Sequence, residues 1–399
     1  MKATYPKAEK VVSRERARQM VLAAQGLDKK SALGKGKAGA LNAIHHLGYV
    51  QLDTLAVVAR AHHHTLWSRS PDYSEDNLHA LLSEKEIFEY WSHAAAFLPM
   101  KDFRFSLVRK QEFLSGKSHW FKKDKKIMAF VLDRIRAEGP LQAKDFETDR
   151  KRGTWFDWKP AKIALEQLFQ EGTLMVTRKS FQKVYDLTER VIPAGTNTQI
   201  PSHEEYADYL IRSAVRAHGI ASVKDITHLR KGVLPLVAKQ LEKMVEGNEI
   251  EKMAIEGIDE VFYVLKDGNI KLRPSNGLHI LSPFDNATIR RERLLKLFNY
   301  DYSIECYLPE HKRKYGYFCL PILYNGSFVG RFDPKADRQS KSLIIKNFHL
   351  EHPPEDLSEF LDSFAASLKE FATFNVCDKV VVERTSPAKL KREIAMRLK

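Results

Sequence analysis

The sequence predicts an α+β protein with three tandem winged helix-turn-helix units followed by a small mixed α/β, barrel-like C-terminal domain. Three observations predict this class: a repeated motif in the middle of the chain, a weaker copy near the N-terminus, and alternating strand-like segments beyond residue 271. The 399 residues also exceed what one hydrophobic core usually serves, so several domains are expected. We place the domains at residues 1–115, 116–200, 201–270 and 271–399.

The repeat in the middle of the chain joins a short charged motif to a helix and a hairpin. Arg136-Ala137-Glu138-Gly139 recurs as Arg216-Ala217-His218-Gly219, and a Lys-Asp pair lies just beyond each copy. Each copy leads into apolar residues at helical spacing, and then into Gly172 or Asn248, which predict left-handed helix caps. Strand-like pairs follow at 173–177 with 183–187, and at 249–253 with 260–265. This order of helix, short helix, helix and hairpin is typical of a winged helix-turn-helix.

The N-terminal region repeats the pattern in a weaker form, with the same apolar spacing ahead of Gly48. A strand is expected at 48–54. Residues two apart in a strand point the same way, so Gln51 and Asp53 are expected side by side, with their apolar neighbours facing the core. A helix should follow near 56–69. An amide beside a carboxylate can hold and polarise one water molecule, which outlines a hydrolytic site.

The C-terminal third alternates between apolar and polar residues. Strands are expected at 302–308, 315–323, 327–332 and 342–349, followed by a helix at 357–371, a strand at 379–383 and a basic terminal helix. Asn325-Gly326 predicts a hairpin turn between two of the strands. The segment therefore predicts a small curved sheet or partial barrel.

The charge of the chain indicates a polyanionic partner. Lys and Arg number 65 against 51 Asp and Glu, which gives a formal net charge of +14. No apolar run approaches the roughly 20 residues that span a bilayer, and the N-terminus is too charged for a secretory signal. Cys306, Cys319 and Cys377 are odd in number and widely spaced, so they predict neither a disulfide framework nor a zinc site. We expect a reducing, cytoplasmic setting and no membrane partner, and no zipper or obvious dimer helix argues against a monomer.

A set of motifs across nearly the whole chain points further. They are Gln51 to Thr54, Val58 to His63, Leu66 to Arg69, Phe88 to Ala95, Asp157 to Lys162, Val184 to Arg190, Leu281 to Asn286, Arg291 to Leu295, Lys314 to Tyr317 and Gly330 to Arg338. Together they resemble the YcaQ/AlkZ type of winged-helix DNA glycosylase. The resemblance implies a basic channel for double-stranded DNA and removal of alkylated purines, including unhooking of interstrand crosslinks. It also implies a bacterial cytoplasmic protein that works at the nucleoid. The catalytic signature of this family is a Gln, then an apolar residue, then a Gln or an Asp, and Gln51 and Asp53 match it. The form with Asp resembles the broad-specificity branch that unhooks crosslinks.

The chemistry implied by this resemblance suits the two side chains. Alkylation at N7 makes guanine cationic, so the base can leave without a strong general acid. A carboxylate at Asp53 can then act as general base and face the positive charge that develops on the sugar, as in other glycosidic hydrolyses. Gln51 can hold the water by hydrogen bonds. We expect no cofactor and no metal, and no lysine is placed for a Schiff base, so strand cleavage is not expected of this monofunctional enzyme.

Several residues have a second interpretation. Asp53 ahead of a helix also fits an N-cap, which could coexist with catalysis. Tyr90, Trp91 and His93 either support the active site or pack in the core. The run His62-His63-His64 does not predict a metal site, because consecutive helical residues diverge by roughly 100°. Phosphate contact or packing remains for these histidines.

The expected DNA contacts come from three regions. They are Arg60, His62, His63 and Arg69; Lys159 and Lys162; and Arg331, Lys335 and Arg338. In the last region, charge contacts within the turn itself compete with DNA contact. The rival hypothesis is a non-enzymatic winged-helix DNA-binding protein or transcription regulator. An acid facing phosphates weakens binding, so the two hypotheses differ at Asp53.

Overall fold

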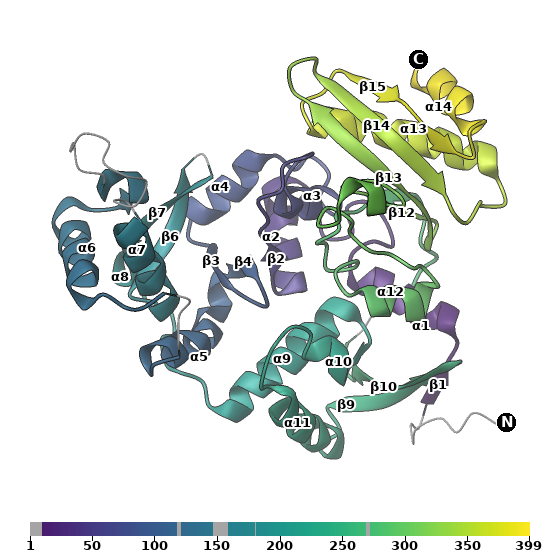
Figure 1. Cartoon of the computed structure of the whole chain (residues 1–399). Coiled ribbons are helices and arrows are strands. Elements are labelled where there is room, and N and C mark those ends of the chain that lie inside the picture. Colours follow the sequence, from purple (N-terminus) through teal and green to yellow (C-terminus); the bar gives the residue numbers. More distant parts are fainter. Residues whose placement is uncertain (1–9, 118–120, 147–158, 180, 269–271) are drawn as a thin grey trace. The chain divides into compact units, whose positions relative to one another are not determined.

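Figure 1 shows the computed structural model of the chain, which describes residues 10–117, 121–146, 159–179, 181–268 and 272–399. The chain divides into two compact units, residues 1–75 with 210–399 and residues 76–209. Both units combine helices with sheets, so the predicted α+β class is confirmed. Within the described residues, no helix combines the length and the apolar character needed to cross a membrane.

The larger unit contains most of the helices and strands. Its helices are α1 (Arg14–Ala24), α2 (Gly36–Leu47), α3 (Ala61–Trp67), the end of α9 (His203–His218), α10 (Val223–Ile226), α11 (Leu234–Glu246), α12 (Arg291–Phe298), the 3-10 helix η3 (Glu310–Lys312), α13 (Leu357–Phe374) and α14 (Leu390–Leu398). Its strands are β1 (Lys10–Val12), β2 (Val50–Gln51), β8 (Ala221–Ser222), β9 (Ile250–Ile255), β10 (Ile258–Leu265), β11 (Leu278–Ile280), β12 (Leu320–Tyr324), β13 (Ser327–Asp337), β14 (Ser342–Leu350), β15 (Lys379–Val382) and β16 (Thr385–Ser386).

One sheet of this unit has the strand order β1-β9-β10-β8. The predicted hairpin is present as β9 and β10, which pair antiparallel, while β8 lies along the other side of β10. The N-terminal strand β1 pairs parallel with β9, with Lys10 opposite Met253. This long-range pairing was not predicted, since a strand of three residues is too short to show an alternating pattern.

The second sheet has the order β11-β12-β13-β14-β15, with β16 also beside β14. Helix α13 buries a row of phenylalanines against it, and Phe364 of the helix contacts Phe332 of β13 and Phe348 of β14. The predicted turn is confirmed, because Asn325 and Gly326 join β12 to β13 with φ of +46° and +85°.

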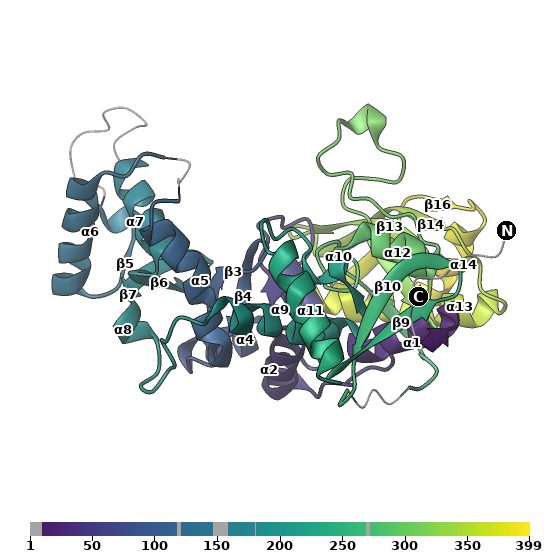
Figure 2. The same cartoon turned by 90° about the horizontal axis from the view of Figure 1, so that it is seen from below.

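The strand predicted at 302–308 is wrong. That segment belongs to a loop between α12 and β12 that carries η3, and Figure 2 shows it projecting from the rest of this unit. Only the start of the segment is packed: the rings of Tyr300 and Tyr302 stack 5.8 Å apart, and the Tyr302 hydroxyl donates to the carbonyl of Cys319 at 2.6 Å. Tyr307 and Leu308 at its end are exposed.

The smaller unit contains the elements α4 (Glu75–Ser83), β3 (Ile87–Trp91), β4 (Ala95–Pro99), η1 (Met100–Asp102), α5 (Phe103–Leu114), α6 (Lys125–Glu138), β5 (Leu141–Gln142), η2 (Ala143–Phe146), α7 (Lys159–Glu171), β6 (Leu174–Lys179), β7 (Gln182–Leu187), α8 (Thr188–Val191) and the start of α9. Helix α6, the short η2, helix α7 and the β6–β7 hairpin follow in the predicted order. The number of winged-helix units and the four domain boundaries stay predictions.

Candidate active site

The chain enters the candidate site through a glycine cap. Helix α2 ends at Gly48, which has φ of +76° and donates its N–H to the carbonyl of Ile44 at 3.0 Å. A Cβ atom at this position would lie 2.4 Å from the Oγ of Ser213 in α9. The left-handed backbone favours glycine, and a side chain here would also displace the Ser213 hydroxyl, so the cap fixes the direction in which β2 starts.

The two predicted catalytic side chains follow the cap, although they do not share a strand. Strand β2 ends at Gln51. Asp53 therefore lies outside the strand, and strand geometry does not place its side chain beside that of Gln51. The Gln51 side chain is also buried, with the residue 8% exposed, whereas Asp53 is half-buried. The prediction that Gln51 points away from the core is therefore wrong, whereas Asp53 keeps access to solvent.

The carboxylate of Asp53 is held by a local turn. Its Oδ1 atom accepts the N–H of Leu55 at 2.7 Å, an arrangement typical of an Asx turn. Helix α3 begins at Ala61 with Arg60 as its N-cap residue. The helix expected near 56–69 therefore starts later, and the interpretation of Asp53 as a helix cap is wrong.

Hydrogen bonds anchor the backbone on both sides of this turn. Asn286 donates from Nδ2 to the carbonyl of Tyr49 at 3.2 Å, just before Gln51. After the turn, the N–H of Ala59 donates to Oδ1 of Asn375 at 2.6 Å. Both bonds tie the segment to distant parts of the same unit, so Asp53 is displayed on a backbone held at each end.

A buried ion pair holds the helix that follows. Arg69 donates from Nη1 and Nη2 to the two carboxylate oxygens of Asp285 at 2.6 and 2.8 Å, and neither side chain is exposed to solvent. The guanidinium also donates to Gln25 through Nε and Nη2. This bidentate pair joins the end of α3 to the segment that supplies Asn286.

The electrostatics of Asp53 favour a base. Burial raises the pKa of its carboxyl above the usual range, and the hydrogen bond from Leu55 offsets part of that effect. Burial also raises the pKa of the Cys306 thiol, and the nearby charge of Asp53 adds to the rise. A raised pKa makes the ionised carboxylate a better proton acceptor than a fully solvated one.

The loop that carries η3 is the part of this neighbourhood that the sequence did not indicate. Burial of its hydroxyl raises the pKa of Tyr307, and the charges of Cys306 and Asp53 add to the rise, although the residue as a whole is 73% exposed. Glu305 fixes the base of the loop, because its carboxylate accepts the N–H groups of three consecutive residues, Lys314 to Gly316, at 2.8–3.1 Å. An exposed aromatic side chain on a fixed loop thus lies close to the candidate base.

The predicted supporting aromatics lie in the smaller unit. Tyr90 is buried and its hydroxyl donates to the carbonyl of Gln170 at 2.6 Å, which favours the packing interpretation over active-site support. Trp91 is 37% exposed, and the guanidinium of Arg109 lies 4.8 Å from its ring centroid. His93 is half-buried. Support of Asp53 by Trp91 or His93 stays a prediction.

Four of the predicted DNA contacts are buried. His62, His63, Arg69 and Arg331 are each exposed by 4% or less. The Nδ1 atom of His63 lies 2.7 Å from the Tyr73 hydroxyl, and the Arg331 guanidinium is paired with Glu351 at 2.7 and 2.8 Å. The structure thus corrects the expected phosphate-binding role of these four residues, because their polar atoms lie within the protein interior.

The remaining candidates divide by exposure. Lys162, Lys335 and Arg338 are exposed and Arg60 is half-buried, whereas the side chain of Lys159 lies outside the described residues. Lys335 lies near the end of β13, and Arg338 is the first residue after that strand. These exposed cations stay predicted DNA contacts. Within the described part of the chain, no group of three or more His, Cys, Asp or Glu residues is arranged to hold a metal ion.

The comparison with known proteins decides the family. A sequence model described as DNA glycosylase AlkZ-like matches residues 44–374, which include Gln51 and Asp53. The chain belongs to the AlkZ-like DNA glycosylase family. The family acts on DNA as a hydrolase of N-glycosyl bonds, so this AlkZ-like chain is a DNA repair glycosylase, and the resemblance stated from the sequence is confirmed. The fold agrees with the solved structure of the Streptomyces sahachiroi DNA glycosylase AlkZ, at a TM-score of 0.64 over 93% of this chain and 99% of that one. The two sequences are 15% identical, so this likeness shows the shared fold.

Proposed function

We propose that this AlkZ-like protein hydrolyses the N-glycosidic bond of N7-alkylated purines in double-stranded DNA, including guanines joined in interstrand crosslinks. Asp53 acts as the general base and Gln51 orients the attacking water. The observation that carries the proposal is the half-buried carboxylate of Asp53, which accepts the N–H of Leu55. Burial raises the pKa of this carboxyl.

The reaction balances without a cofactor. The bond between C1′ and N9 breaks, and its electron pair neutralises the cationic alkylated purine, which leaves as the free base. The water oxygen bonds to C1′, and its proton passes to the Asp53 carboxylate. The same carboxylate faces the positive charge that develops on the sugar. With a simple lesion the products are a free alkylated purine and an abasic site in an uncut strand. With a crosslink, the cleaved guanine stays attached to the opposite strand through its alkyl tether, and the two strands become separable.

The half-exposed position of Asp53 suits a bulky lesion. A guanine tethered to the opposite strand cannot rotate fully into a closed pocket, as most glycosylases require. Because the Asp53 carboxylate is only partly buried, a base that stays close to its duplex can approach it. This supports crosslinked guanine as a substrate beside simple 7-alkylguanine.

The proposal is tested with purified protein and two duplexes, one containing a single 7-methylguanine and one containing a nitrogen-mustard crosslink. Released base and alkali-labile abasic sites are measured, with and without alkali to separate base release from strand cleavage. We expect free 7-methylguanine from the first duplex, loss of the crosslink from the second, and strand breaks in both only after alkali. Binding of both duplexes without release of any base would instead support a non-enzymatic DNA-binding protein.

A further inference from the structure

Strand β15 forms an open edge of the C-terminal sheet. It is the last strand in the order β11-β12-β13-β14-β15, and it pairs in parallel with β14, from Lys379 opposite Ser342 to Val382 opposite Ile345. Among the residues that the structure describes, no strand pairs with the other side of β15. A strand that is paired on one side only leaves about every second N–H and C=O group on its open side. Such an edge can accept another strand.

The two faces of this edge differ in burial. Val380 and Val382 are half-buried and pack against the hydrophobic core of the sheet. Lys379, Val381 and Glu383 alternate with them and are exposed, with Val381 exposed by 41%. Within the described part of the chain, neither Lys379 nor Glu383 forms an ion pair. The open edge thus presents an exposed valine between two unpaired side chains of opposite charge.

The charges along this edge are complementary to those of a second copy of the same edge. Residues 378–384 read Asp-Lys-Val-Val-Val-Glu-Arg. In an antiparallel pairing of two copies about a two-fold axis at Val381, Lys379 of each copy lies opposite Glu383 of the other. The same pairing places Asp378 opposite Arg384, and the remaining valines opposite each other. Opposite charges that face each other across two strands stabilise the pairing.

Two alternatives explain this pattern less well. Charged side chains often protect an open edge from pairing, but protection is strongest when charges of one sign repel a second copy. Here the arrangement attracts one. Asp378 already has an exposed partner, because its carboxylate lies 3.7 Å from Nζ of Lys341. The pairs between Lys379 and Glu383 therefore carry the argument, and Asp378 with Arg384 adds to it.

The backbone is compatible with the same register. A two-fold axis through one residue places even-numbered residues opposite even-numbered ones and odd-numbered residues opposite odd-numbered ones. Because successive residues of a strand turn their N–H and C=O groups to opposite sides, the groups that point outward on one copy meet groups that point outward on the other. Hydrogen bonds and ion pairs thus form in one and the same alignment.

We propose that β15 pairs antiparallel with β15 of a second copy of this chain, with the two-fold axis at Val381. The two C-terminal sheets then form one continuous sheet across a symmetric dimer. This interface goes beyond the proposed glycosylase function and does not depend on it. It replaces the monomer expected from the sequence, which rested on the lack of a zipper. An open strand edge is formed by the fold and has no such signature in the sequence.

The first test is sedimentation velocity of the full-length protein. An interface built on one strand edge is small, so the dimer should be weak, and we expect reversible conversion of monomer to dimer between about 1 and 300 μM protein. Because the ion pairs are exposed, a rise in salt concentration should weaken the dimer.

Variants that exchange the two charges test the register. Lys379→Glu alone should weaken the dimer at least about tenfold, because both pairs between positions 379 and 383 become repulsive. The double variant Lys379→Glu with Glu383→Lys restores opposite charges in both pairs and should regain the affinity of the wild type. Likewise, a mixture of the Lys379→Glu protein with the Glu383→Lys protein should associate, although each alone should remain mainly monomeric.

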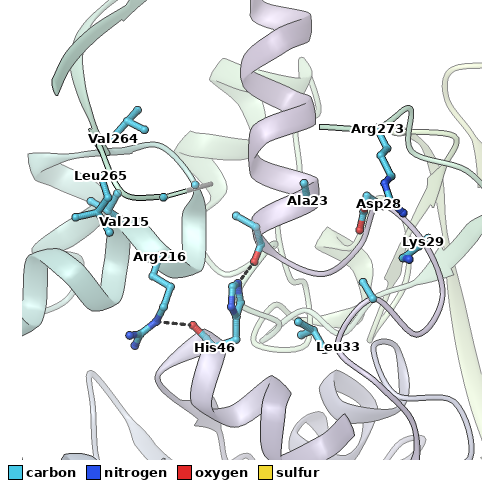
Figure 3. Close-up of a pocket in the computed structure, with 14 residues that line it drawn as sticks. Ala23, Asp28, Lys29, Leu33, His46, Val215, Arg216, Val264, Leu265 and Arg273 are labelled. Atoms are coloured by element: carbon cyan, nitrogen blue, oxygen red, sulfur yellow. Dashed lines mark hydrogen bonds between the residues drawn. The ribbon is translucent and has the colours of Figure 1, made fainter. Parts of the chain in front are cut away.

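The matched control is Lys29→Glu, which makes the same charge reversal at another exposed lysine. Figure 3 shows Lys29 at a cavity between α1, α2, α9 and β10, and no described residue of β14 or β15 lines that cavity. This variant should dimerise as the wild type does. A protein that stays monomeric throughout the concentration range would overturn the proposal. So would a dimer that Lys379→Glu leaves intact, or a double variant that fails to regain affinity.

Discussion

The pair formed by Arg69 and Asp285 gives a sharp prediction about how the larger unit is stabilised. Both side chains are fully buried, and the carboxylate accepts two guanidinium hydrogen bonds of 2.6 and 2.8 Å. Asp285→Asn keeps the shape of the side chain and an oxygen for the N–H of Ala287, but it leaves a buried guanidinium without its counter-ion. Loss of one partner of a buried pair costs about 3–5 kcal/mol, so the free energy of unfolding should fall by about that amount.

The assay is urea denaturation followed by the intrinsic fluorescence of the five tryptophans, one of which is Trp67, the last residue of helix α3. The double variant Arg69→Met with Asp285→Leu removes both charges and should lose much less stability than the sum of the single variants. A loss below about 1 kcal/mol for Asp285→Asn would refute the structural role. So would an Arg69→Met variant that keeps its stability and binds DNA more weakly, since that result would restore Arg69 as a DNA contact.

Three further predictions concern charge. Because burial raises the pKa of Asp53 above 3.8, the excision rate should fall as the pH is lowered through that raised value, with an acid limb that Asp53→Asn abolishes. Burial among aromatic rings lowers the pKa of Lys110 to about 7 from 10.5, so the unfolded chain binds more protons between these values. Stability should therefore rise with pH across that window, and Lys110→Met should flatten the dependence in denaturation measurements at pH 7 to 9. The double variant Lys335→Gln with Arg338→Gln should bind DNA with a weaker dependence on salt. The slope of log affinity against log salt concentration should fall by about 1 for each of these cations that binds a phosphate in the wild type. Lys346→Gln is the control for that slope, and an unchanged slope in the double variant would exclude contact with DNA.

Much of the local structure followed from sequence patterns, because its determinants are local. The β9–β10 hairpin and the Asn325-Gly326 turn depend on neighbouring residues, and both are present. The strand expected at 302–308 is absent, since only Tyr302 at its start stacks on Tyr300 and its end is exposed. The parallel pairing of β1 with β9 joins residues that are far apart in the sequence, so no local pattern indicates it.

The candidate site divides in the same way. Gln51 and Asp53 were found as a motif, since they are two residues apart. The nearness of Tyr307 to Asp53 arises only through folding, so no local pattern indicates it. Arg69 and Arg331 were expected on the surface because arginine is rarely buried without a partner. Their partners, Asp285 and Glu351, become visible only in the structure.

The most direct test of the account is single-turnover excision of 7-methylguanine by Asp53→Asn. Loss of a positioned general base should lower the rate by roughly 10²–10⁴-fold, while affinity for the same duplex stays equal or rises because a negative charge is removed. Asp72→Asn makes the same chemical change at an exposed position whose φ of +64° suits asparagine, and its rate should match the wild type. Excision by Asp53→Asn at the wild-type rate would contradict the assignment of Asp53 as the base.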